Sequence, residues 1–207
     1  MSLELWFTFV LASVALVVIP GPTVLLTVSY ALTQGRRIAL ATAAGVALGD
    51  FLAMSASLAG LGALIATSAT LFTVLKWVGA AYLVYLGIKL LRTPAMTVKI
   101  DEETAPIGAA AIFWHATAVT ALNPKSIGFF IAFVPQFMRP ERPLMPQFVT
   151  LIITFVTIGA ISAFSYAMLA DHLRRYIRRP SVMRWMTRTG GGTLIGMGAL
   201  TATLQRS

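Results

Sequence analysis

The sequence lacks cysteine altogether and has very little charge. Its 207 residues include two histidines and only 11% charged residues, whereas typical soluble domains carry about 25%. Without cysteine the chain forms no disulfide, no Fe–S cluster and no thiolate metal site. The two histidines, His115 and His172, are too far apart in sequence for a short metal-binding spacing. We therefore expect neither a metal nor a cofactor.

Apolar residues take the place of the missing charge and make up 57% of the chain. About 20 apolar residues are needed to cross a membrane, and six stretches are candidates. They lie at about 3–33, 38–66, 70–91, 109–138, 146–169 and 189–204, and the last is short and rich in glycine. We predict an all-α integral membrane protein with a single membrane domain over residues 1–207 and six transmembrane helices.

The net charge of +9 comes mainly from loops, which favours a membrane protein over one that binds nucleic acid. Eleven basic residues follow the first, third and fifth spans, namely Arg36, Arg37, Lys89, Arg92, Lys99, Arg174, Arg175, Arg178, Arg179, Arg184 and Arg188. This side is predicted to be cytoplasmic, with both termini outside. Residues 172–188 are read as an ordinary positive-inside loop, with a segment that attracts anionic lipid headgroups as the alternative.

The first span is interrupted by Pro20-Gly21-Pro22, followed by Thr23. Proline fixes φ and removes a backbone donor, so this stretch cannot lie in an undisturbed helix. Lipid does not hydrogen-bond the freed backbone groups, which must be buried in protein or line a cavity. Two interpretations fit the stretch alone: a simple proline kink, or one wall of a substrate site like those in broken helices of secondary transporters.

The fourth span has a matching interruption at Asn123-Pro124-Lys125. Three spans are an odd number of crossings, so a second copy enters from the opposite side. We predict two inverted three-helix repeats, about 1–92 and 109–207, joined by a cytoplasmic loop at about 93–108, with the first and fourth helices broken at midplane. Pro22 and Pro124 suit the first helical position after the N-caps Gly21 and Asn123. Such helix N-termini favour an anion such as a carboxylate.

Asp50 follows Gly45 and Gly49 in the second span and is placed near the midplane by its position in that helix. A buried carboxylate there needs a partner, and Lys125 is the obvious one. The pair either holds helices together or serves transport, with Asp50 exchanging a proton. Gly45 and Gly49, like Gly192 and Gly196 in the last span, form small faces that suit an internal helix contact or a dimer seam.

These residues together resemble the LysE/RhtB family of bacterial exporters. The resemblance covers nearly the whole chain and rests on Pro20-Gly21-Pro22, Gln34-Gly35-Arg36-Arg37, Gly45-x-x-x-Gly49-Asp50, Tyr82-Leu83-Val84-Tyr85-Leu86-Gly87 and Asn123-Pro124-Lys125. It implies export of amino acids or close derivatives across the bacterial inner membrane, driven by protons as an antiport. It also implies a homodimer. The substrate is not fixed by any residue.

The predicted substrate site consists of Pro20, Gly21, Pro22, Thr23, Asn123, Pro124 and Lys125, with Asp50 as the proton-coupling residue. A proton-independent uniporter or channel, or a non-transporting membrane scaffold, remains the alternative. No nucleophile motif, phosphate-binding loop or pair of catalytic carboxylates is visible, so we expect no enzyme. Tyr82 and Tyr85 are interpreted as packing or interface residues. His115 lies close to the predicted cytoplasmic end of the fourth span, and a role in a proton path is the less favoured interpretation for it.

Overall fold

The computed structural model describes residues 2–19, 21–35, 38–92, 107–139, 142–177 and 180–203. Every described element is helical. In chain order they are α1 (Leu3–Val18), α2 (Pro22–Gln34), α3 (Ala39–Thr67), α4 (Ala69–Arg92), α5 (Ala109–Ala121), α6 (Pro124–Ala132), the short 3₁₀ helix η2 (Val134–Phe137), α7 (Leu144–Ile177) and α8 (Pro180–Thr203). The predicted all-α class therefore holds for the described residues.

Both predicted helix breaks are present. The first break separates α1 from α2, which meet at an angle of 56°, and the second break separates α5 from α6. As predicted, a proline begins each second helix, and Gly21 and Asn123 occupy the N-cap positions in extended conformation. Pro20 lies outside the described residues.

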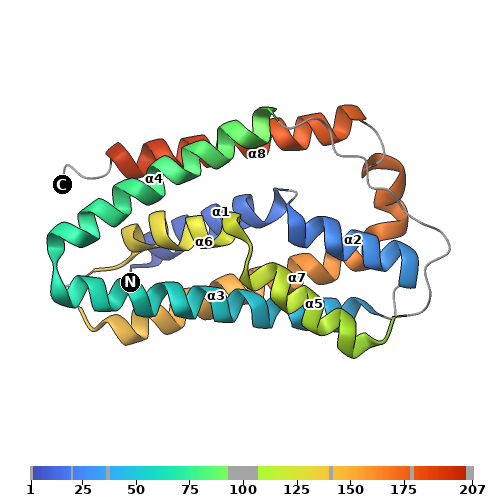
Figure 1. Cartoon of the computed structure of the whole chain (residues 1–207), viewed down its shortest axis with the longest axis horizontal. Helices are drawn as coiled ribbons and strands as arrows, with labels where there is room; N and C mark the ends of the chain where they lie inside the picture. Colours follow the sequence, from blue (N-terminus) through green and yellow to red (C-terminus); the bar gives the residue numbers. More distant parts are fainter. Residues whose placement is uncertain are drawn as a thin grey trace.

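The helices form three layers (Figure 1). α4 and α8 run side by side along one edge, α1, α6 and α2 lie in the middle, and α3, α5 and α7 form the opposite layer. Glycines bring two of these pairs into backbone contact. A Cβ at Gly87 would lie 2.6 Å from the Gly191 carbonyl oxygen between α4 and α8, and one at Gly49 would lie 2.7 Å from the Thr117 carbonyl oxygen between α3 and α5.

Three of the described helices are long and apolar enough to cross a membrane, over Ala39–Ala63, Thr73–Arg92 and Leu144–Ala170. The bent pair of α1 and α2 makes a fourth crossing if it is counted as one span. α5 is a shorter apolar helix, and α6 has only 9 residues. Length and hydropathy among the described residues thus give up to four crossings where the sequence predicts six.

The predicted loop at 172–188 is the clearest correction to the boundaries. α7 continues to Ile177 and α8 begins at Pro180, so most of this basic stretch is helical. A hydropathy window ends a span where the charges begin, but arginine is a good helix former and the helix continues past the apolar part. Pro180 fits the first position of α8 because that position needs no backbone donor.

A cluster of phenylalanines fills the space between α1, α6, η2 and α7. Its members, all at most 5% exposed, are Phe9, Phe129, Phe130, Phe133, Phe137 and Phe155. Their rings contact one another at centroid distances between 4.8 and 6.4 Å. This cluster forms part of the main core on the α1 side of the two breaks.

Candidate functional site

A small cavity lies where the two breaks meet. Its volume is about 40 Å³, and side chains from α2, α3, α6 and α7 line it together with the end of α1. A single water needs roughly 10–15 Å³ measured this way, so the cavity has room for a few waters and not for an amino acid. The structure therefore represents a conformation in which this space has no room for a larger solute.

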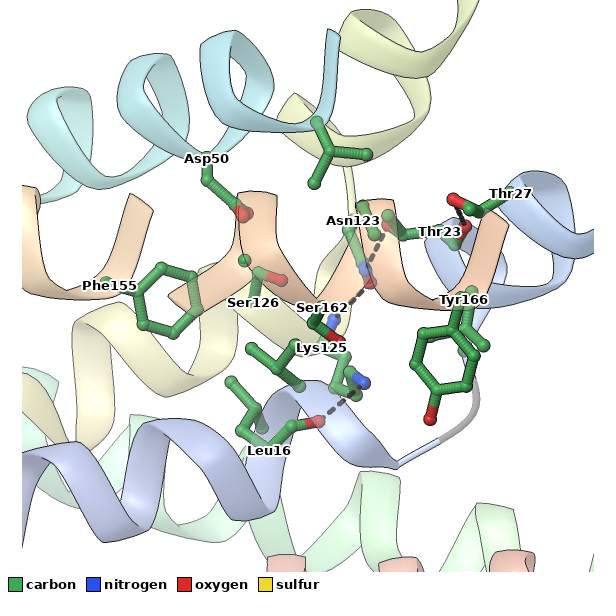
Figure 2. A pocket seen from close by; sticks show the side chains of 16 residues that line it. Leu16, Thr23, Thr27, Asp50, Asn123, Lys125, Ser126, Phe155, Ser162 and Tyr166 are labelled. Atoms are coloured by element: carbon green, nitrogen blue, oxygen red, sulfur yellow. Dashed lines mark hydrogen bonds between the residues drawn. The ribbon is translucent and has the colours of Figure 1, made fainter. Parts of the chain in front are cut away.

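Direct hydrogen bonds join the two breaks across this cavity. The Asn123 side-chain amide donates to the Thr23 hydroxyl at 3.2 Å, and Thr23 shares a 3.4 Å hydroxyl contact with Thr120. The Asn123 side-chain oxygen accepts from the Lys125 backbone N–H at 3.0 Å and caps α6. One asparagine thus caps its own half-helix and binds the half-helix of the other break (Figure 2).

The Lys125 ammonium is bound to the end of α1. It donates to the backbone oxygens of Leu16 at 2.9 Å and Ile19 at 2.8 Å, and the Tyr166 hydroxyl donates to the Val18 oxygen at 3.2 Å. The final carbonyls of a helix lack internal partners and favour a cation, so this arrangement stabilises the end of α1. An ammonium has three N–H donors, and these two bonds leave one for the cavity.

The start of α2 differs from the start of α6 because its cap has no side chain. Gly21 makes no side-chain cap to the first turn of α2, and a Cβ built there would lie only 3.3 Å from the Lys125 nitrogen. The first-turn N–H groups of a helix are donors without internal partners. α2 therefore offers donors and partial positive charge to the cavity, whereas the N–H groups of α6 are partly satisfied by Asn123.

Asp50 provides the carboxylate of the cavity. It lies on α3, is 4% exposed, and its side chain points toward Ser126 and the cavity in Figure 2. Among the described residues, its carboxylate forms neither an ion pair nor a hydrogen bond. The expected Asp50–Lys125 ion pair is therefore absent, because α1 already holds the Lys125 ammonium.

Several predicted site residues do not line the cavity. Pro22 and Pro124 are exposed and act on the site by starting their helices. Gly45 and Gly49 press on the α5 backbone, whereas a Cβ at Gly192 or Gly196 would meet nothing within 4 Å. These last two glycines make no internal contact and face outward on α8.

The aromatic and histidine residues set aside in the sequence also lie elsewhere. Tyr82 packs against Gly128 and stacks with Tyr85, with ring centroids 6.1 Å apart. His115 accepts or donates a 2.6 Å hydrogen bond at its Nδ1 with the Tyr30 hydroxyl, which joins α2 to α5 away from the cavity. In the part of the chain that the structure describes, no three His, Cys, Asp or Glu side chains are grouped as metal ligands would be.

α7 contributes a wall of the cavity that is not among the residues predicted from the sequence. This helix places one wall through Phe155, Gly159, Ser162 and Tyr166. Their spacing of three or four residues places them on one face of the helix. Two hydroxyl side chains and a glycine on one face of an apolar span are the sequence signal that could have identified this wall. Thr27, one turn after Thr23 on α2 and 0% exposed, follows the same rule.

Known proteins similar to this chain are membrane proteins. One relative, described as an "Uncharacterized membrane protein" of Vibrio cholerae, is 39% identical over 203 residues, which are 98% of each chain. The "Homoserine/homoserine lactone efflux protein" of Salmonella typhimurium is 32% identical over the whole of both chains. The "Leucine efflux protein" of Salmonella choleraesuis is 30% identical over 97% of this chain and 95% of its own. No solved structure matches the chain.

The match to a protein family covers nearly the entire chain. The family described as "LysE type translocator" matches residues 14–205, which include both helix breaks, Asp50 and all of the described cavity wall. The named relatives are efflux proteins. The chain therefore belongs to the LysE type translocator family, whose members are membrane transporters and not enzymes.

Proposed function

We propose that this protein exports amino acids or close derivatives by alternating access around the cavity between its two helix breaks. The observation that carries the proposal is that Thr23 and Asn123, one from each break, are hydrogen-bonded beside the buried carboxylate of Asp50. Relatives named for the efflux of homoserine, homoserine lactone and leucine support the class of substrate. Broken helices that meet at the bilayer midplane are typical of such transporters.

The proposed architecture is six spans in two inverted three-helix repeats, in the cytoplasmic membrane of a bacterium, with both termini outside. In this scheme α1 with α2, α3 and α4 correspond to α5 with α6, α7 and α8. A two-fold relation would bring corresponding helices together, and α3 packs on α7 while α4 packs on α8. The contact between the two breaks supports the same relation.

The substrate carboxylate is proposed to bind at the start of α2. The start of α2 and the Lys125 ammonium lie next to each other on the cavity wall, and two of the three Lys125 donors are used on α1. Such a combination of helix N-terminus and cation suits an anion. Pro20, Pro22 and Pro124 would set the geometry of the breaks, and Thr23 and Asn123 would hold the two half-helices at the site.

Asp50 is proposed to couple export to proton entry. Its carboxylate is buried and makes no direct ion pair among the described residues, and a charge at that depth is costly. Protonation of Asp50 would therefore change the free-energy difference between a conformation in which the carboxylate is buried and one in which it is exposed to water. The cavity of about 40 Å³ must open to one side for the substrate to enter.

Purified protein in liposomes tests this function. Labelled homoserine and leucine should accumulate by counterflow, and an imposed pH gradient should drive uphill transport. Asp50→Asn should insert and fold yet lose the gradient-driven component, while the exposed α8 variant Thr189→Ala should behave as wild type. Uphill transport at the wild-type level by Asp50→Asn would exclude the coupling role, and absence of counterflow with every amino acid would exclude the exporter.

The proposed assembly is a homodimer in the lipid bilayer. Gly192 and Gly196 leave an open small-residue face on α8, and α8 is not among the helices whose hydropathy suits a membrane span. A second copy of the chain packed on this face would shield α8 from contact with lipid. Cross-linking of single cysteines placed at these two positions, in a chain that has no native cysteine, tests the contact directly.

A further inference from the structure

We propose that the Asp50 carboxylate binds the ammonium group of the substrate, and that a proton and the substrate occupy this carboxylate in turn. The proposal rests on the function proposed above and specifies what the cavity recognises. The substrates would then be small solutes with a free amine. Exchange with protons would follow because the substrate ammonium and the proton compete for the same carboxylate.

In the described part of the chain, Asp50 has no cation in direct contact with its carboxylate. Removing a carboxylate from water is costly unless a proton, a cation or hydrogen-bond donors neutralise it. Asp50 is 4% exposed and makes neither a direct ion pair nor a hydrogen bond among the described residues, so the charge of Lys125 acts on it only across the cavity. The nearby cation of the cavity, Lys125, uses two of its three donors on the α1 carbonyls of Leu16 and Ile19.

The cavity residues named beside the Asp50 carboxylate are small or carry hydroxyls. Gly159 on α7 faces it so closely that any side chain there would collide with the Asp50 Oδ2 atom. α7 is continuous from Leu144 to Ile177, so no turn requires a glycine at this position. The hydroxyls of Ser126 and Ser162 line the same cavity, and within the described ranges neither makes a hydrogen bond. An ammonium needs such oxygens for its remaining donors.

The negative and positive groups lie on different walls of the cavity. Asp50 lies on one wall, whereas Lys125 and the start of α2 lie on the other, and Ser126 and Ser162 lie between them in Figure 2. A zwitterionic amino acid matches this polarity at both ends. Besides Asp50 and Lys125, Tyr166 is the titratable side chain on the described cavity wall. The described helices α2 and α5 add only uncharged threonines in or near the cavity, namely Thr23, Thr27, Thr117 and Thr120.

Competition for one carboxylate is sufficient for antiport. When Asp50 holds the substrate ammonium it cannot hold a proton, and release of the substrate outside leaves the carboxylate free to take a proton back. The two ligands must then weaken each other's binding by the same factor, because thermodynamic coupling is reciprocal. No second proton-binding residue is required.

Two analogues of leucine separate this proposal from the proposed function. The 2-hydroxy acid of leucine keeps the carboxylate and lacks the amine, and leucinamide keeps the amine and lacks the carboxylate. We expect the hydroxy acid to compete in leucine counterflow at least tenfold more weakly than unlabelled leucine. A hydroxy acid that competes as well as leucine would overturn the role of Asp50. Weak competition by leucinamide would support the separate proposal that the start of α2 binds the substrate carboxylate.

The Asp50→Asn variant should lose the discrimination between amine and hydroxyl. Its preference for leucine over the hydroxy acid should fall to about twofold or less, while Thr189→Ala keeps the wild-type preference. A preference of tenfold or more in Asp50→Asn would overturn the proposal and leave export itself standing. Total absence of counterflow in the wild type would instead contradict the proposed function.

A measurement on the wild type keeps the proposal testable if Asp50→Asn does not fold. Acidifying the substrate side should raise the half-saturating leucine concentration, approaching about tenfold per pH unit once protons outcompete the amine. Maximal flux at saturating leucine should stay unchanged in exchange mode, and replacing sodium by choline should have no effect. A fall in maximal flux with unchanged half-saturation would show that protons and substrate bind different groups.

Discussion

The two helix breaks have the same sequence logic and different structures. At the first break the N-cap is Gly21, α2 starts without a side-chain cap, and the carbonyls at the end of α1 are bound by Lys125 and Tyr166. At the second break Asn123 caps α6, and the N–H groups of Leu122 and Asn123 bond to the last turn of α5. The second break satisfies its own backbone, and the first depends on other helices.

This difference assigns distinct tasks to the two breaks. The self-contained second break supplies the groups that complete the first, since Asn123 binds Thr23 and Lys125 binds the end of α1. The first break keeps open donors at the start of α2, where a ligand can use them. If the repeats exchange conformations during transport, the first break is the one whose contacts must be released. Its partners are therefore the residues to change.

The largest effect is expected from Lys125→Met. The variant removes both hydrogen bonds to the end of α1 and leaves the Leu16 and Ile19 oxygens unpaired at membrane depth, at a cost of roughly 2–5 kcal/mol. Thermal unfolding in detergent, followed by tryptophan fluorescence, should show a large fall in midpoint. Arg92→Met on the exposed end of α4 serves as the control. Equal midpoints for the two variants would mean that the first break does not depend on Lys125.

The next largest effect is expected from Gly49→Ala, which acts on the second break. An alanine Cβ would lie 2.7 Å from the Thr117 oxygen and 3.0 Å from the Ala121 backbone nitrogen, so α5 must move just before it ends. Overpacking of this kind costs about 1–3 kcal/mol. Gly60→Ala lies on the same helix with nothing within 4 Å and should be neutral or slightly stabilising. A destabilisation of equal size in both variants would contradict the tight α3–α5 contact.

Much of the fold follows from the sequence because its strongest signals are local. Prolines after Gly21 and Asn123 determine where α2 and α6 begin, and long apolar runs determine α3, α4 and α7. The boundary between α7 and α8 was wrong because hydropathy reports where a helix leaves lipid and not where it ends. Arginine-rich helix and arginine-rich loop have the same hydropathy.

The partners of individual side chains are harder to predict. Asp50 and Lys125 were expected to pair because both are charged and near the same depth, but the carbonyls at the end of α1 compete for the ammonium. Backbone acceptors carry no signal in the residue types, so this competition is invisible in the sequence. The outward direction of Gly192 and Gly196 likewise depends on which face of α8 meets α4, and both faces contain glycine.

A smaller effect is expected from Asn123→Ala, which removes the cap of α6 and the link between the breaks. Loss of an N-cap typically costs about 1 kcal/mol. Thr23→Val separates the two roles, because it removes the hydroxyl that accepts from Asn123 and leaves the Asn123 oxygen on the Lys125 N–H. If the link matters for transport, Thr23→Val should retain more stability than Asn123→Ala and yet share its slower counterflow. Wild-type flux in Thr23→Val would show that the link is dispensable.

The smallest effect is expected from Tyr166→Phe, which removes a single hydrogen bond to the Val18 oxygen. At 3.2 Å and with Lys125 holding the neighbouring carbonyls, this bond should contribute about 0.5–1 kcal/mol. Tyr85→Phe on the exposed face of α4 is the matched control. If the first break opens during transport, Tyr166→Phe should increase the counterflow rate by weakening the closed state while lowering the unfolding midpoint slightly. A slower rate with an unchanged midpoint would instead place the hydroxyl on the substrate, and the end of α1 would then be held by Lys125 alone.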